Sequence, residues 1–144
     1  NVTALYPYHD VVARSVAHAD LVVGAVLVTG AKAPKVLTRD MVAGMEPGSV
    51  LVDIAIDQGG CFETSRPTTW EAPTYVEEGV THFCVTNMPG AVPRTSSQAI
   101  CAAILPWVDR LASGRDPASD PALARGINVA DGRLVHPALL EMSP

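Results

Sequence analysis

Two continuous runs of apolar residues constrain the fold of this chain more than any other feature of its sequence. Residues 20–28 read DLVVGAVLV, and residues 49–56 read SVLVDIAI. Continuous apolar runs of this length are typical of strands that are covered on both faces, as in parallel sheets. A third run, HFCVTN at residues 82–87, predicts another strand. With the helical patterns between and after them, the three runs predict a parallel α/β fold.

Helix signals flank the apolar runs. Asp10 is expected to cap a first helix that extends to about Ala19, and Thr38 to cap a short helix over residues 39–45. Residues 58–78 are rich in Thr, Pro and Gly and are predicted to be mostly loop. A short helix near residues 122–125 and a turn at residues 131–132 are expected in the tail.

The longest predicted helix extends from Thr95, which with Gln98 forms a capping-box pattern, to about Ser113. Pro106 should kink this helix, and Gly114 is a plausible C-terminal cap. Its apolar residues fall on one stripe, and we expect one face of this stripe to lose part of its cover in this chain. The stripe consists of Ile100, Ile104, Trp107, Val108 and Leu111.

Composition and charge exclude several classes of function. The 144 residues suit one domain, with 48% hydrophobic and 17% charged residues, which argues against disorder. A net charge of −5 with scattered Lys and Arg argues against binding to nucleic acid or to anionic membranes. No apolar run approaches the roughly 20 residues of a membrane span, and no signal-peptide pattern is present. Cys61, Cys84 and Cys101 have no metal-ligand spacing, so we expect no metal site and a reducing, cytoplasmic location.

Polar loops follow each of the three predicted strands. GAKAP follows the first at residues 30–34, DQGG the second at 57–60, and NMPG the third at 87–90. Ligands of open α/β sheets bind beyond the carboxyl ends of the strands, so the three loops predict a site at one sheet edge. Asp57 is the candidate catalytic carboxylate. Asp53, inside the run, is expected to be a structural acid bonded to backbone.

The residues around these loops resemble the NAD-dependent alanine dehydrogenases. The matching stretches extend from about residue 19 to residue 109: GAVLVTGAKAPKVLTRDMV, PGSVLVDIAIDQGGCFETSRPTTW and TNMPGAVPRTSSQA. The resemblance implies a Rossmann domain that binds NAD, inserted in a substrate-holding domain, and a homo-oligomer, which is a hexamer in the family. It also implies reversible oxidative deamination of L-alanine to pyruvate and ammonia.

The resemblance assigns roles to individual residues. Asp57 falls on the family's catalytic aspartate, where a carboxylate beside the substrate nitrogen would stabilise the iminium or position the attacking water. Two groups of residues fall on cofactor-contacting positions. They are Ile54, Asn87 and Met88 in the loops, and Val26 and Leu27 at the end of the first strand.

The family's phosphate loop, G-x-G-x-x-G, has no counterpart in this sequence. We therefore expect residues 1–113 to form the C-terminal half of a Rossmann domain, and residues 114–144 a partial catalytic-domain segment or a disordered tail. We expect the chain to be inactive alone. One alternative is a transhydrogenase-type nucleotide-binding domain, against which DIAIDQGG argues. Another is a non-catalytic remnant that acts as an assembly module.

Other polar residues near the loops allow two interpretations. Lys32 and Lys35 are either solvated loop lysines or ligands for a phosphate or carboxylate. Gln58, Gly59 and Gly60 either form a plain turn or let the backbone approach the nicotinamide closely. Cys61 has no nearby histidine to activate it, and the four histidines are expected to be structural.

Overall fold

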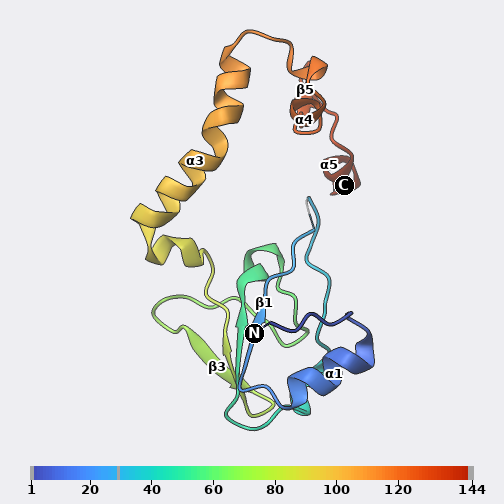
Figure 1. Ribbon diagram of the computed structural model, residues 1–144, viewed down its shortest axis with the longest axis vertical. Coiled ribbons are helices and arrows are strands. Elements are labelled where there is room, and N and C mark those ends of the chain that lie inside the picture. Colours follow the sequence, from blue (N-terminus) through green and yellow to red (C-terminus); the bar gives the residue numbers. More distant parts are fainter. Residues whose placement is uncertain (1, 29, 143–144) are drawn as a thin grey trace. The chain divides into compact units, whose positions relative to one another are not determined.

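The computed structural model describes residues 2–28 and 30–142, which divide into two compact units, residues 1–88 and 89–144. The first unit is built on a four-stranded sheet of order β1-β2-β4-β3 (Figure 1). β1, β2 and β4 are parallel, and β3 is antiparallel to β4. The strands are β1 (Leu21–Gly24), β2 (Val50–Asp53), β3 (Thr74–Glu77) and β4 (Val80–Phe83). The predicted parallel α/β class is confirmed.

The parallel strands are shorter than the apolar runs that predicted them. β1 ends at Gly24, which pairs with Asp53, the last residue of β2. The chain then forms a 3-10 helix, η1 (Ile54–Gln58), so residues 25–28 have no strand beside them to extend the ladder. The expectation that β1 is covered on both faces is wrong for the described chain, because Leu21 and Val23 are exposed. The third strand begins at Val80, two residues before the predicted start.

The edge strand β3 lies within a segment that was predicted to be loop. Glu78 and Gly79 connect it to β4 with φ values of 53° and 78°. Two consecutive residues with positive φ are typical of the tight type I′ turn that matches the twist of a hairpin. The sequence signal is the alternation in TYVE followed directly by Glu-Gly, which the high content of Thr and Pro upstream obscures.

Two short helices cover the core of the first unit. α1 spans His9–Ala17, and Asp10 does not cap it: Tyr8 is the N-cap residue, while Asp10 lies inside the helix and pairs with Arg14 at 3.2 Å. α2 spans Arg39–Ala43, and its predicted cap is confirmed, since the Thr38 hydroxyl accepts a hydrogen bond from the Met41 N–H. The core cluster includes Val16, Leu37, Met41, Val42, Leu51, Phe62 and Val80.

The second unit is mainly helical. After the 3-10 helix η2 (Met88–Ala91) its elements are α3 (Pro93–Ala112), η3 (Pro117–Ser119), α4 (Pro121–Ala124), β5 (Val129–Ala130), β6 (Arg133–Leu134) and α5 (Pro137–Met142) (Figure 1). The predicted helix near residues 122–125 corresponds to α4. Asp131 and Gly132, both with positive φ, form the predicted turn between β5 and β6.

The long helix α3 differs from its prediction at the start. It begins at Pro93, and Thr95 lies inside it, so the predicted capping box is wrong. Proline suits the first helical position because its φ is already helical and its missing N–H would have no partner there. α3 continues through Pro106 as one helix, and Gly114 with a φ of 72° follows its last residues, as expected for a C-terminal cap.

The predicted apolar stripe of α3 is exposed in the described chain. Its residues Ile100, Ile104, Trp107, Val108 and Leu111 are 41% to 59% exposed. Within residues 2–28 and 30–142, none of the helices is both long and apolar enough to cross a membrane. The division after residue 113 into a nucleotide domain and a catalytic-domain segment stays a prediction.

Candidate functional site

Asp57 and Asn87 meet at the edge where the parallel strands end. Asp57 does not directly follow its strand, as the sequence suggested, but lies within η1. Asn87 lies in the segment after β4 and has a left-handed φ of 51°. Its backbone N–H donates to both carboxylate oxygens of Asp57, at 3.1 Å to Oδ1 and 3.2 Å to Oδ2. The structure therefore brings together two site residues that the sequence predicted from different loops.

The other predicted site residues also follow the carboxyl ends of the parallel strands. Leu27 after β1 is 70% exposed and Ile54 after β2 is 50% exposed, which is high for aliphatic side chains at the end of a sheet. Val26 packs partly against the core, and Met88 after β4 is half-buried. Contact of these side chains with a cofactor stays a prediction.

Asp53 has the structural role that the sequence predicted for it. Its side chain is fully buried at the end of β2. Oδ2 accepts hydrogen bonds from the Cys61 backbone N–H at 2.8 Å and from the Ser65 hydroxyl at 2.5 Å. A buried carboxylate needs such donors to offset its lost hydration. These bonds hold the segment after η1 against the end of the strand.

Cys61 lies directly beside this carboxylate. Its thiol donates to Asp53 Oδ1 at 3.4 Å. Burial, together with the negative charge of Asp53, raises the pKa of Cys61 to about 12. The side chain is therefore a neutral thiol near pH 7, and only a thiolate is an effective nucleophile. This fits the expectation that Cys61 is not catalytic.

Lys35 has a role that the sequence did not indicate. Its ammonium donates to the backbone carbonyl oxygens of Gly59, Gly60 and Phe62, at 2.9, 2.8 and 3.0 Å. Lys35 is exposed overall, but its three ammonium donors are engaged by these carbonyl groups, so it is not free to bind an anion. Lys32, in the same loop, is exposed. No pattern of residue types around Lys35 signals this role, because its partners are backbone atoms more than twenty residues away.

The two glycines after η1 differ in what surrounds them. Both have a positive φ, 92° at Gly59 and 74° at Gly60. A Cβ atom on Gly60 would lie 2.8 Å from Ser65 Cβ and 2.9 Å from Asp53 Oδ2, whereas one on Gly59 would meet nothing within 4 Å. Packing alone thus explains the glycine at position 60, and a close approach to the nicotinamide stays a prediction.

His82 is buried and fully bonded, as expected of a structural histidine. Its Nδ1 lies 2.9 Å from the Val80 carbonyl oxygen, which can only accept, so Nδ1 carries a proton. Its Nε2 lies 2.8 Å from the Thr64 hydroxyl, and its ring stacks on Tyr75. Among the described residues, no group of three or more His, Cys, Asp or Glu side chains could hold a metal ion.

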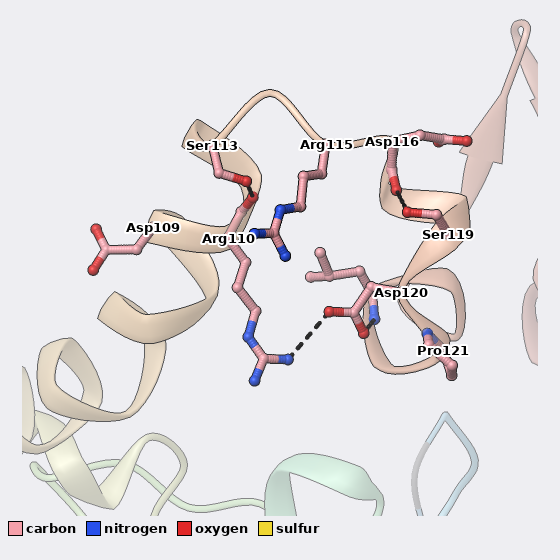
Figure 2. A pocket seen from close by; sticks show the side chains of 9 residues that line it. Asp109, Arg110, Ser113, Arg115, Asp116, Ser119, Asp120 and Pro121 are labelled. Carbon is pink, nitrogen blue, oxygen red and sulfur yellow. Dashed lines mark hydrogen bonds and ion pairs between the residues drawn. The ribbon is translucent and has the colours of Figure 1, made fainter.

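A cavity of about 610 Å³ lies within the second unit (Figure 2). Arg110 and Asp120 face each other across it and form an ion pair at 3.2 Å. Asp120 also accepts from the Ala122 backbone N–H, which lowers the pKa of this carboxyl and caps α4. None of the predicted site residues line this cavity, and its charged residues Arg110, Asp116 and Asp120 are engaged in pairing or helix capping.

Comparison with known proteins identifies relatives over nearly the whole chain. Residues 1–137 match the family described as alanine dehydrogenase/PNT, C-terminal domain. The chain is 57% identical over 135 residues to an alanine dehydrogenase of Halomonas elongata, and 56% identical over 129 residues to one of Mycolicibacterium smegmatis. These alignments cover 92% and 88% of this chain.

Two solved structures share the fold. An L-alanine dehydrogenase superposes with a TM-score of 0.78 at 48% identity, covering 93% of this chain and 38% of the other. A transhydrogenase from Sinorhizobium meliloti superposes with a TM-score of 0.69 at 26% identity, covering 91% and 36%. The chain spans about a third of the length of the curated relatives it matches, 36% of the Halomonas protein. It belongs to the family of the alanine dehydrogenase and PNT C-terminal domain.

Proposed function

We propose that this chain carries the catalytic carboxylate, Asp57, and the nicotinamide end of the NAD site of an alanine dehydrogenase. The reaction is the reversible oxidative deamination of L-alanine to pyruvate and ammonia. One observation carries the proposal: an exposed carboxylate is held by the Asn87 backbone N–H at the sheet edge where ligands of such folds bind.

The residues at this edge fit one end of the cofactor. Leu27 and Ile54 offer exposed apolar surface to a planar ring, and the exposed Asn87 side chain offers an amide to its carboxamide group. When bound, NAD would supply the acceptor for the two electrons removed from the substrate. The chain has no G-x-G-x-x-G segment, so its residues fit the nicotinamide end and leave the pyrophosphate without its usual anchor.

Asp57 would act through its charge. Oxidation of the amine leaves a positive iminium carbon–nitrogen bond, which a carboxylate fixed in advance stabilises without reorganising. A single N–H occupies one side of the carboxylate, so lone pairs remain for the substrate nitrogen or for the water that attacks the iminium carbon.

The transhydrogenase alternative has weaker support. The two solved structures cover similar shares of this chain, 93% and 91%, but the alanine dehydrogenase is 48% identical and the transhydrogenase 26%. The remaining alternative, a non-catalytic assembly module, requires that no nicotinamide nucleotide binds at this edge. Titration of NADH into the chain tests this alternative, since the module should leave the nucleotide's fluorescence unchanged.

Assembly and location complete the proposal. We propose a homo-oligomer, hexameric as the family resemblance implies, and the exposed apolar stripe of α3 supports burial against another surface. We propose a cytoplasmic location, which is supported by the free thiols of Cys61, Cys84 and Cys101.

The test is Asp57→Asn in a complete alanine dehydrogenase that contains this segment. Turnover should fall by roughly a hundredfold or more, because the substitution removes charge stabilisation, while KM for NAD changes little. Asp40→Asn, an exposed acid at the start of α2, is the matched control and should leave turnover unchanged. Turnover within a factor of two of the unmodified enzyme would show that Asp57 is only a turn residue.

A further inference from the structure

We infer that Lys35 is a positioning residue for Asp57: its ammonium fixes the turn after η1 and so holds the segment that presents the carboxylate. The hydrogen bonds of this turn do not depend on any function of Asp57. Only the importance of the carboxylate's position for turnover rests on the function proposed for Asp57.

The ammonium of Lys35 is saturated by backbone carbonyls. A lysine ammonium has three N–H donors and no acceptor. The three carbonyl oxygens of Gly59, Gly60 and Phe62 lie 2.8–3.0 Å from Nζ, which is the range of charge-assisted hydrogen bonds. No donor remains for a phosphate or a carboxylate. The planar guanidinium of arginine would not converge on three oxygens in this way.

One peptide group of the turn is held at both ends. The Gly60 carbonyl accepts from Lys35 Nζ at 2.8 Å, and the next N–H, that of Cys61, donates to Asp53 Oδ2 at 2.8 Å. Carbonyl and N–H belong to the same planar peptide unit. A cation from the first polar loop and a buried carboxylate from β2 therefore fix the orientation of this plane.

Backbone hydrogen bonds hold the segment that contains Lys35 beside the turn. The Ala33 N–H donates to the Gln58 carbonyl at 3.0 Å, and the Val36 N–H donates to the Cys61 carbonyl at 2.7 Å. Residues 33–36 thus run beside residues 58–61. Gly60 and Phe62 are buried, so their carbonyls would lack a ready substitute if the ammonium were removed.

The turn is connected directly to Asp57. The Gly59 N–H donates to the Ile56 carbonyl and the Gly60 N–H to the Ala55 carbonyl, both at 3.0 Å, which closes η1 around Asp57. Displacement of residues 59 and 60 would therefore loosen the helix that carries the carboxylate. Because the Asn87 N–H donates to the Asp57 carboxylate, its hydrogen-exchange rate reports whether this carboxylate stays in place.

The experiment measures amide hydrogen exchange by NMR in the 144-residue chain, with no cofactor present. Lys35→Met should raise the exchange rate of the Asn87 N–H about tenfold, toward the rate in Asp57→Ala, because charged hydrogen bonds of this kind are worth about that factor. Exchange in β2 and β4 should stay unchanged. Lys32→Met, which removes an exposed lysine of the same loop, should have no effect.

A chemical rescue keeps the test decisive if Lys35→Met fails to fold. Lys35→Cys in a Cys101→Ser background is alkylated with 2-bromoethylamine, which attaches an aminoethyl group and restores an ammonium at nearly the same reach. Cys61 and Cys84 are buried and poorly ionised, so they should not react. The alkylated protein should regain the slow exchange of Asn87.

Three results would overturn the inference. One is an unchanged Asn87 exchange rate in folded Lys35→Met; another is a folded, alkylated protein in which exchange stays fast. Equal acceleration of every amide would show a general loss of stability instead of positioning, and would also overturn it. Failure of the Asp57→Asn test would leave these exchange results untouched, so the two proposals fail separately.

Discussion

Replacement of Gly60 by alanine tests whether the turn after η1 is closed by packing against Asp53. Gly59 supplies a matched control, because it is the adjacent residue and also has a positive φ. An alanine at either position carries the strain of a left-handed backbone, about 1–2 kcal/mol. Only at Gly60 would the new Cβ meet other atoms.

The steric cost at Gly60 can be judged from its neighbours. The added Cβ would lie 2.8 Å from Ser65 Cβ and 2.9 Å from Asp53 Oδ2, distances that real Cβ contacts essentially never show. Asp53 is fully buried and bonded to Cys61 and Ser65, so it cannot swing away cheaply. Overpacking of this kind costs about 1–3 kcal/mol. Gly60→Ala should therefore destabilise the fold by about 2–5 kcal/mol, against about 1–2 kcal/mol for Gly59→Ala.

Urea unfolding of the two variants, followed by circular dichroism, measures the difference. The midpoint should fall further for Gly60→Ala, with an unchanged m-value, if the native state loses stability and the unfolded state keeps its dimensions. The backbone strain at Gly59, with a φ of 92°, is at least as large as at Gly60, so strain alone cannot reverse the order. Equal losses at both positions would refute the packing of Gly60 against Asp53.

Two further predictions concern stability at high pH and association. Burial raises the pKa of Cys61 from 9.0 to about 12 and also raises the pKa values of Cys84 and Tyr75, so the folded state keeps protons that the unfolded state loses. The contribution of these three groups to the free energy of unfolding should thus be constant below about pH 8 and fall from pH 9 toward 12; urea titrations at pH 7.5 and 10.5 that give the same midpoint would contradict this. The apolar β1 residues Leu21 and Val23 and the stripe of α3 are exposed, so the chain should self-associate above its 15.1 kDa mass in light scattering. A monodisperse monomer with a cooperative melt would show that these surfaces are covered within the chain.

The class of the fold could be predicted because continuous apolar runs have few alternatives. Residues 20–28 and 49–56 are too short for buried helices between loops and too apolar for half-solvated strands, which leaves the parallel sheet. The ends of the strands could not be predicted, since the apolar pattern continues through Ile56 while β2 stops at Asp53. The stop coincides with hydrogen bonds from Cys61 and Ser65, which hydrophobic periodicity does not encode.

The candidate site, like the fold, could be predicted from the sequence only in part. Asp57 and Asn87 could be named from the polar loops and the family resemblance, and the structure places them in contact. Lys35 could not, because its partners are carbonyl groups that every residue possesses. A lysine in a loop, between Pro34 and Val36, looks solvated in the sequence. Its ammonium becomes structural only when the fold brings the turn at residues 59–62 alongside.

The two aspartates of DIAID show how the same side chain acquires different roles four residues apart. Asp53 ends a strand, is fully buried, and accepts from the N–H of Cys61 in the following turn. Asp57 lies on η1, is exposed, and accepts from the N–H of Asn87 beyond the next parallel strand. The buried carboxylate and Lys35 hold one peptide group between them, and the exposed carboxylate depends on the turn that this peptide group closes. A rigid turn therefore explains why a buried strand carries an acid at its end: the first aspartate fixes the backbone that presents the second, the carboxylate proposed to act on the substrate.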